Sequence, residues 1–188
     1  MNKLHLKLCS SVEWGQVVKN EILPWTLGEH SLGDRVLEIG PGPGLTTDIL
    51  RRRVPQLTAL ELDPDLAAAL ATRLGGTGVE VVCADATAMP FDADVFSAAT
   101  SFTMLHHVPT ATRQDALMAE VRRVLRPGGL FIGVDSVDSI GFRSLHEDDI
   151  CNPLDPGTLA AQLASGGFTA VEVETADMRF RFSARKPG

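Results

Sequence analysis

Short apolar runs alternate with amphipathic stretches along most of the 188-residue chain. The runs have the length of buried strands and lie at 35–39, 57–62, 79–83, 95–102 and 130–135. The stretches that repeat apolar residues at helical spacing lie at 45–54, 64–74 and 112–125, with another helix opening at 155–156. Strands that alternate with helices build βαβ units, whose parallel sheet is covered on both faces. The pattern therefore predicts an α/β fold in one doubly wound domain.

The start of the chain departs from this alternation. Apolar residues from Trp14 to Trp25 fall on one face of a helix that begins at Ser10 or Ser11. Pro24 is expected to bend or end this helix, because proline lacks the backbone donor that a helix interior needs. We therefore expect an N-terminal helical cap at 1–33, followed by the α/β domain at 34–188.

The end of the chain departs from it as well. Two strand-like segments, 168–175 and 178–184, are separated by only Ala176 and Asp177. So short a link permits a hairpin, whereas a parallel crossover needs a dozen or more residues. The last strand is therefore expected to run antiparallel to its neighbour.

The first strand leads directly into a glycine-rich turn, Gly40-Pro41-Gly42-Pro43-Gly44, which opens the next helix. Glycines at alternate positions let the backbone turn tightly and approach a ligand, and the following helix presents free N–H groups. Glu38 comes just before the turn, where its carboxylate is placed to meet a cationic amino group. The turn therefore predicts a small-ligand site.

Acidic residues follow the next two strands. Glu61 comes 21 residues after Gly40, close to the ~20 expected for a carboxylate that holds ribose hydroxyls. Asp85 follows the third strand, where it is placed to accept a hydrogen bond from an adenine amino group. Because ligands bind at the carboxyl ends of the strands in open α/β sheets, these residues and the glycine turn predict one nucleotide-binding site.

The glycine spacing argues against one class of nucleotide enzyme. The dinucleotide fingerprint is GxGxxG, and its third glycine would fall where this chain has Leu45. The GxGxG spacing lacks that fit to a pyrophosphate, so a nicotinamide-dependent oxidoreductase is the weakest interpretation.

Charge and composition narrow the expected partners. The formal net charge is −7, whereas a domain that mainly binds nucleic acid usually carries a basic surplus. No apolar run reaches the ~20 residues that cross a bilayer, and the start lacks the apolar core of a signal peptide. We therefore expect a cytoplasmic protein without a membrane partner, in which Cys9, Cys83 and Cys151 are unrelated thiols.

Taken together, the motifs resemble those of class I S-adenosylmethionine-dependent methyltransferases. The segment 38–44 resembles the first motif of that family, and Glu61, Asp85 and the runs 104–108 and 126–129 resemble its later motifs in the usual order. The resemblance is closest to the small-molecule group related to ubiquinone-biosynthesis methyltransferases. It implies a Rossmann-like, seven-stranded, mostly parallel sheet with an antiparallel last strand. It also implies S-adenosylmethionine as cofactor and S-adenosylhomocysteine as product.

The resemblance also implies roles for individual residues. The three glycines of the turn would line the methionine part of the cofactor, and Ser101 would approach its amino group. Glu61 would bind the ribose, with Leu62 beside the adenine. Asp85 and Ala86 would hold the adenine itself. The expected cofactor-binding residues are Glu38, Gly40, Gly42, Gly44, Glu61, Leu62, Asp85, Ala86 and Ser101.

The expected reaction is in-line transfer of a methyl group to an oxygen, nitrogen or carbon atom of a small molecule. The donor is already activated, so the enzyme chiefly positions the reactants, and a base is needed only where the acceptor must lose a proton. His106 and His107 follow the fourth strand and are the candidate catalytic residues, with packing of the loop as the alternative. Asp135, at the end of the fifth strand, is a second candidate.

The segment 136–152 is expected to cover the acceptor pocket together with the N-terminal helix. It contains His146, the acidic run 147–149 and Cys151, which are groups that can bind a metal or a cationic substrate. A solvated acidic loop is the commoner meaning of such a charge run. No metal site is therefore expected.

Two other functions stay open on the sequence. The segments 38–42 and 59–63 also resemble rRNA adenine dimethyltransferases. The aromatic motif that this family carries after the fourth strand is replaced here by the sequence at 101–104, and the chain has no tyrosine. A non-catalytic S-adenosylmethionine-binding protein is the third interpretation, since no catalytic side chain is obligatory for methyl transfer. The sequence leaves open whether the chain is a monomer or a homodimer.

Overall fold

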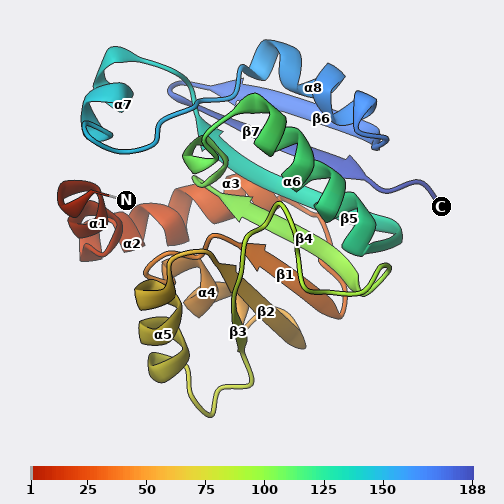
Figure 1. Ribbon diagram of the computed structural model, residues 1–188, viewed down its shortest axis with the longest axis horizontal. Helices are drawn as coiled ribbons and strands as arrows, with labels where there is room; N and C mark the ends of the chain where they lie inside the picture. The colour runs from red at the N-terminus through yellow and green to blue at the C-terminus, as the bar shows by residue number, and fades with distance from the viewer. Residues whose placement is uncertain (1) are drawn as a thin grey trace.

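Seven strands form one sheet between two layers of helices in the computed structural model, which describes residues 2–188 (Figure 1). The strand order is β3-β2-β1-β4-β5-β7-β6. β1 to β5 run parallel, and β7 runs antiparallel to both β5 and β6. The doubly wound sheet with a reversed last strand is therefore confirmed. The strands are β1 Arg35–Ile39, β2 Gln56–Glu61, β3 Glu80–Cys83, β4 Phe96–Phe102, β5 Leu125–Ser136, β6 Thr169–Ala176 and β7 Arg179–Arg185.

The helices cover both faces of this sheet. α6 and α8 pack on one face, whereas α3, α4 and α5 pack on the other. No helix within residues 2–188 is long and apolar enough to cross a membrane. The helical elements are α1 Lys3–Cys9, α2 Val12–Val17, the π-helix η1 Val18–Ile22, α3 Leu23–Leu27, α4 Leu45–Leu50, α5 Pro64–Arg73, the 3-10 turn η2 Leu105–His107, α6 Ala111–Val124, α7 Ile140–Leu145 and α8 Pro156–Ser165.

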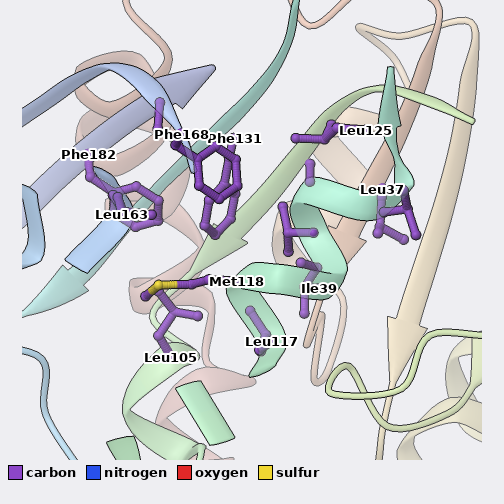
Figure 2. Close-up of a cluster of buried hydrophobic side chains, with 14 of the residues drawn as sticks. Leu37, Ile39, Leu105, Leu117, Met118, Leu125, Phe131, Leu163, Phe168 and Phe182 are labelled. Atoms are coloured by element: carbon purple, nitrogen blue, oxygen red, sulfur yellow. The ribbon is translucent and has the colours of Figure 1, made fainter. Parts of the chain in front are cut away.

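The larger core lies between the sheet and the pair α6 and α8 (Figure 2). Phe131 of β5 and Phe182 of β7 meet edge to face, with ring centroids 4.9 Å apart. Met118 of α6 and Leu163 of α8 pack against the same cluster. Burying a side chain of this size stabilises the fold by about 1.5–3 kcal/mol. This packing holds β5 and β7 together under α6 and α8.

The N-terminal helix continues through Pro24 instead of ending there. Ser11 caps it by accepting a hydrogen bond from the backbone N–H of Trp14 (3.1 Å). Pro24 lacks an N–H, and its ring would clash with the carbonyl of Asn20 in a regular α-helix. The π-helical turn η1, which comes directly before α3, widens the backbone at this point. The sequence did not reveal α1, because its apolar residues Leu4, Leu6 and Leu8 alternate with polar ones, which is the spacing of a strand.

Two other boundaries differ from the prediction. α4 ends at Leu50, although apolar residues continue to Val54, because the residue before Pro55 disfavours helical backbone. β5 begins at Leu125, before the Pro-Gly-Gly run that was expected to precede the strand. The extra residues are accommodated by an irregularity in the pairing of β4 with β5.

Gly133 of β5 lies where two neighbouring strands approach closely. A Cβ at this position would lie 2.4 Å from the backbone oxygen of Ser101 and 2.7 Å from the ring of Phe182. We therefore expect Gly133→Ala to lower the free energy of unfolding by about 3 kcal/mol, measured by urea denaturation. Gly141→Ala is the matched control, because nothing lies within 4 Å of its added Cβ. Equal stability of the two variants would contradict this packing.

Candidate functional site

A cavity of about 430 Å³ lies at the carboxyl ends of the first parallel strands. It is next to the point where the strand order reverses, between β1 and β4, which is where open α/β sheets bind ligands. Its volume is in the range of small-molecule sites. The predicted site residues that line it are Gly40, Gly42, Glu61, Leu62, Asp85, Ala86 and His107.

The other predicted residues lie behind this surface. Glu38 and Ser101 are buried in the sheet, and the Ser101 hydroxyl has no hydrogen-bond partner within residues 2–188. Gly44 is the N-cap of α4 and faces Arg73 and Leu70 of α5. His106 is buried beside Asp135. None of these side chains lines the 430 Å³ cavity.

The glycine turn leaves no room for a side chain at its first glycine. Gly40 has a φ of +64°, and a Cβ there would lie 2.1 Å from Cγ of Met104. Gly40 and Gly42 also border a second cavity of about 50 Å³, which Cys9 and Trp14 close from the N-terminal helices. The turn thus borders the larger cavity on one side and the N-terminal helices on the other.

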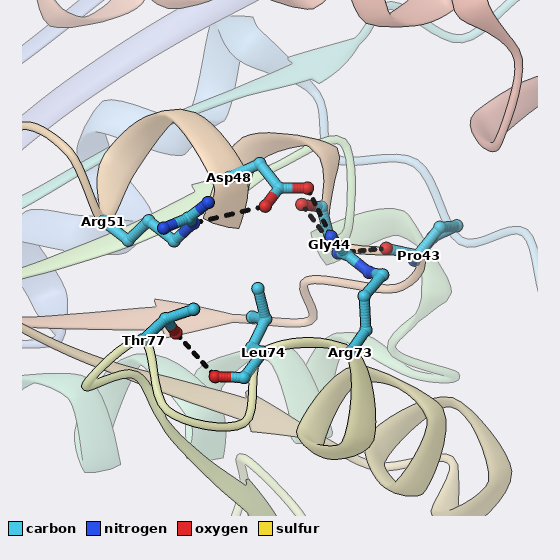
Figure 3. A network of polar contacts seen from close by, with 7 residues as sticks. All are labelled: Pro43, Gly44, Asp48, Arg51, Arg73, Leu74 and Thr77. Carbon is cyan, nitrogen blue, oxygen red and sulfur yellow. Dashed lines mark hydrogen bonds and ion pairs between the residues drawn. The ribbon is translucent and has the colours of Figure 1, made fainter.

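Arg73 of α5 fixes the end of this turn (Figure 3). Its guanidinium donates to the carbonyl oxygen of Pro43 (2.9 Å) and pairs with Asp48 of α4 (2.5 Å). The contact joins two successive βα units. Sequence reasoning missed it, because Arg73 lies at an ordinary position for a basic residue, the last turn of a helix.

Glu61 connects the glycine turn to the second strand. One carboxylate oxygen accepts from the backbone N–H of Gly42 (2.9 Å), and the other accepts from the N–H of Asp63 (3.0 Å). A carboxylate offers about four lone-pair sites, so roughly two stay available on the cavity side. Glu61 can therefore hold two ligand hydroxyls while it keeps the backbone in place.

Asp85 lines the same cavity, and its orientation is fixed by neighbouring side chains. Its carboxylate accepts from the N–H and the hydroxyl of Thr87, both at 2.8 Å, and forms an ion pair with Arg113 of α6. Burial raises the pKa of Asp85, but the Thr87 and Arg113 contacts outweigh it and hold the pKa below its usual range. Asp85 is therefore an ionised acceptor at neutral pH. Arg113 was not anticipated, since its partner is 28 residues away in sequence.

Glu38 is a buried carboxyl group beneath the turn. The Thr46 hydroxyl donates to one of its oxygens, whereas the other has no hydrogen-bond partner in the described chain. Burial raises the pKa of Glu38 to about 7. A cation placed near the free oxygen would offset this burial.

Histidines gather on the cap side of the cavity. His106 is almost completely buried, and its Nδ1 lies 2.6 Å from a carboxylate oxygen of Asp135. Burial and neighbouring histidines lower the pKa of His107 to about 3 and that of His5 to about 4. Both rings are therefore neutral near pH 7. His5 comes from α1, and no sequence pattern predicted its place beside the cavity.

The segment that follows β5 meets the N-terminus. The Asn2 amide side chain donates to the carbonyl oxygens of Leu145 and Glu147, and the Asn2 backbone N–H donates to Asp149 (2.7 Å). α1 and α7 consequently lie on the same side of the sheet, beyond the carboxyl ends of β1 and β4 (Figure 1). Asp149 and Ile150 of this segment reach the wall of the cavity.

Curated relatives match parts of this chain. A fatty-acid O-methyltransferase of Mycolicibacterium smegmatis is 38% identical over 55% of this chain and 38% of its own length. A ubiquinone/menaquinone biosynthesis C-methyltransferase of Desulfotalea psychrophila is 30% identical over 54% and 41%. A ribosomal RNA small subunit methyltransferase A of Acidithiobacillus ferrooxidans is 44% identical, but over only 32% and 23%. The chain thus spans less than half the length of each of these relatives.

A solved structure agrees with the fold over almost the whole chain. Phosphoethanolamine N-methyltransferase 2 of Haemonchus contortus, in complex with S-adenosyl-L-methionine, superposes with a TM-score of 0.76. The superposition covers 93% of this chain and 53% of that one at 18% identity, so it supports the fold. Residues 37–133 match the family described as a methyltransferase domain, and this match runs from β1 through the glycine turn to β5. The chain therefore belongs to the methyltransferase domain family.

Proposed function

We propose that this chain is an S-adenosylmethionine-dependent methyltransferase that acts on a small-molecule acceptor. The observation that carries the proposal is the meeting of three elements in one 430 Å³ cavity: the glycine turn, the Glu61 carboxylate and the Asp85 carboxylate. The family and the two small-molecule relatives support the same reaction. We propose oxygen, nitrogen or carbon as the attacked atom.

The residues present fit this donor. Met104 occupies the space that a Cβ at Gly40 would need, so only glycine lets the backbone of the turn border the cavity at this position. The free oxygen of buried Glu38 is available to balance a cationic amino group. Glu61 keeps lone pairs for ribose hydroxyls, and Asp85, with Leu62 and Ala86 beside it, would hold the adenine end. When bound, the donor supplies an activated methyl group. The protein then contributes chiefly by orienting donor and acceptor, which can supply several kcal/mol of the barrier.

The acceptor would enter from the cap side. We propose that residues 1–33 form a helical cap on the catalytic domain 34–188, and that 136–152 completes the cover. The contacts of Asn2 with Leu145 and Glu147 support this arrangement. A covered site of this kind suits a small molecule. His107, which lines the cavity, and His106, which Asp135 orients behind it, are the proposed catalytic residues.

Two titrations and one turnover assay test the proposal. In calorimetry, S-adenosylmethionine should bind at micromolar concentration and NAD should not bind. S-adenosylhomocysteine release would then be followed with fatty acids, phenols, amines and structured RNA as acceptors. Release with a small molecule supports the proposal. Release with RNA alone would favour the rRNA reaction, and binding without any release would favour a non-catalytic role.

Replacing Asp85 tests the adenine end of the site. Asp85→Ala removes an ionised acceptor whose hydrogen bonds are worth about 1.5–3 kcal/mol, so donor affinity should fall about tenfold or more. Calorimetry measures the change, and Asp115→Ala is the control, because Asp115 lies on the same helix as Arg113 but contacts Gln162. Equal affinities of the two variants would remove Asp85 from the site.

A further inference from the structure

Four of the five histidines of this chain converge in one cluster. They come from three separate segments: His5 from α1, His106 and His107 from η2, and His146 from the end of α7. The ring centroids of His5 and His146 lie 4.4 Å apart, and both lie 5.2 Å from that of His107. The ligand-type nitrogens of these three residues all lie within 4.8 Å of one another.

The nitrogens in this cluster lack the partners that buried polar atoms normally have. Nδ1 of His5, Nε2 of His107 and Nε2 of His146 are buried without a hydrogen-bond partner in the described chain. Each such atom costs about 1–3 kcal/mol unless something compensates it. Nε2 of His106 is also buried without a partner, but His106 is not among the three residues whose ligand-type nitrogens lie within 4.8 Å of one another. Three unpaired nitrogens this close together indicate a missing shared partner. A cation that accepts nitrogen lone pairs would compensate all three at once.

The protonation states agree with this interpretation. Burial lowers the pKa of His5, His107 and His146 below the usual range, so their rings are neutral at pH 7. Neutral imidazole is the form that binds metals. Asp149, whose carboxylate accepts from the Asn2 backbone N–H, acts in the opposite direction and raises the pKa of the same three rings.

One ring is already oriented as a metal ligand. Nδ1 of His146 lies 2.8 Å from the carbonyl oxygen of Phe142, which makes Nδ1 the protonated nitrogen. The lone pair is then on Nε2, the buried atom without a partner. A backbone carbonyl behind the ring is the common outer-shell arrangement of metal-bound histidine.

We propose that His5, His107 and His146 together bind one divalent transition-metal ion of the class that prefers imidazole, such as Zn²⁺, Co²⁺ or Ni²⁺. Three nitrogens at 2.0–2.1 Å from a tetrahedral ion lie about 3.4 Å apart, so side-chain rotations of about an ångström close the site. Three protein ligands leave a fourth position open, as in catalytic rather than structural zinc sites. His107 places the ion at the wall of the cavity. If the proposed function holds, an acceptor oxygen or nitrogen would complete the coordination beside the donor.

Metal titration of the chelator-treated protein tests the site directly. Zn²⁺ binding would be measured by calorimetry, and Co²⁺ binding by its visible absorption, whose intensity distinguishes four-coordinate from six-coordinate geometry. We expect one equivalent to bind. His5→Ala should weaken binding at least about 100-fold, since changing even an outer-shell partner costs 10–100-fold. His5 is the suitable ligand to remove, because α1 is a short terminal helix, and thermal unfolding would verify that the variant folds.

His30→Ala is the matched control, because it is the one histidine outside the cluster and is exposed. Binding that is unchanged in His30→Ala and lost in His5→Ala and His146→Ala supports the site. No binding by the parent protein, six-coordinate Co²⁺ alone, or equal binding by all variants would overturn it and leave an aromatic packing cluster. A parallel S-adenosylmethionine titration separates this result from the proposed function, since donor binding does not involve His5 or His146.

Discussion

Glu61→Ala is expected to weaken S-adenosylmethionine binding at least about 100-fold. Two hydrogen bonds from ribose hydroxyls to an ionised carboxylate are together worth about 3 kcal/mol or more, which is a factor of about 100 in affinity. The substitution also removes the acceptor for the backbone N–H of Gly42 and Asp63. The glycine turn would then lose its connection to β2, so the donor would meet a less ordered loop.

Calorimetric titration measures this effect, with Glu172→Ala as the control. Glu172 is exposed on the edge strand β6, away from the cavity, so its variant should bind the donor like the parent. Glu61→Gln should give an intermediate affinity, because an amide keeps one oxygen acceptor. If Glu61→Ala binds as tightly as Glu172→Ala, the nucleotide site is elsewhere.

Glu38→Gln is expected to make the ligand-free protein more stable at pH 8 by up to about 3 kcal/mol. Burial raises the pKa of Glu38 from 4.5 to about 7, so the folded protein holds this proton more tightly than the unfolded chain. The resulting stability is present below about pH 4.5 and is lost as the pH rises through about 7. A shift of this size corresponds to about 3 kcal/mol. Glutamine stays neutral at every pH, so the Glu38→Gln variant does not lose this stability as the pH rises.

Urea denaturation at pH 5 and pH 8 checks whether Glu38→Gln raises the free energy of unfolding at the higher pH. The two proteins should have similar free energies of unfolding at pH 5 and differ at pH 8. Glu120→Gln is a control of opposite sign, because hydrogen bonding to Arg123 lowers the pKa of Glu120 and its carboxylate is stabilising at pH 8. A Glu38→Gln variant that is less stable than the parent at pH 8 would refute the buried-acid interpretation.

The pH dependence of donor binding should show why the protein has a carboxyl group at Glu38 although its burial lowers stability at neutral pH. The nearby charges of Asp48 and Glu61 favour the protonated form, whereas a cationic amino group would favour the ionised one. The affinity of the parent for S-adenosylmethionine should therefore rise between pH 6 and pH 8, with proton release. The affinity of Glu38→Gln should be lower and show a weaker dependence on pH. A parallel pH profile in both proteins would assign the titration to another group.

The sequence by itself determined the fold class and which strand-end residues meet in the cavity. Apolar residues recur with different periods in strands and in helices, so the alternation of buried runs with amphipathic stretches specified the βαβ order. The link at 176–177 was too short for a parallel crossover and permitted only a hairpin. Glycines and acids at strand ends are local signals. Since parallel strands end at one edge, Gly40, Glu61 and Asp85 had to come together, and they do.

Only the tertiary structure decided which groups partner these residues. The Asp85–Arg113 and Arg73–Pro43 contacts join side chains from different βα units, and no spacing along the chain encodes them. The histidine cluster is the clearest case: His5 and His146 are 141 positions apart, and the acidic run beside His146 had an ordinary explanation as a solvated loop. Local patterns report backbone periodicity, whereas the convergence of side chains depends on how helices and loops pack over the sheet edge.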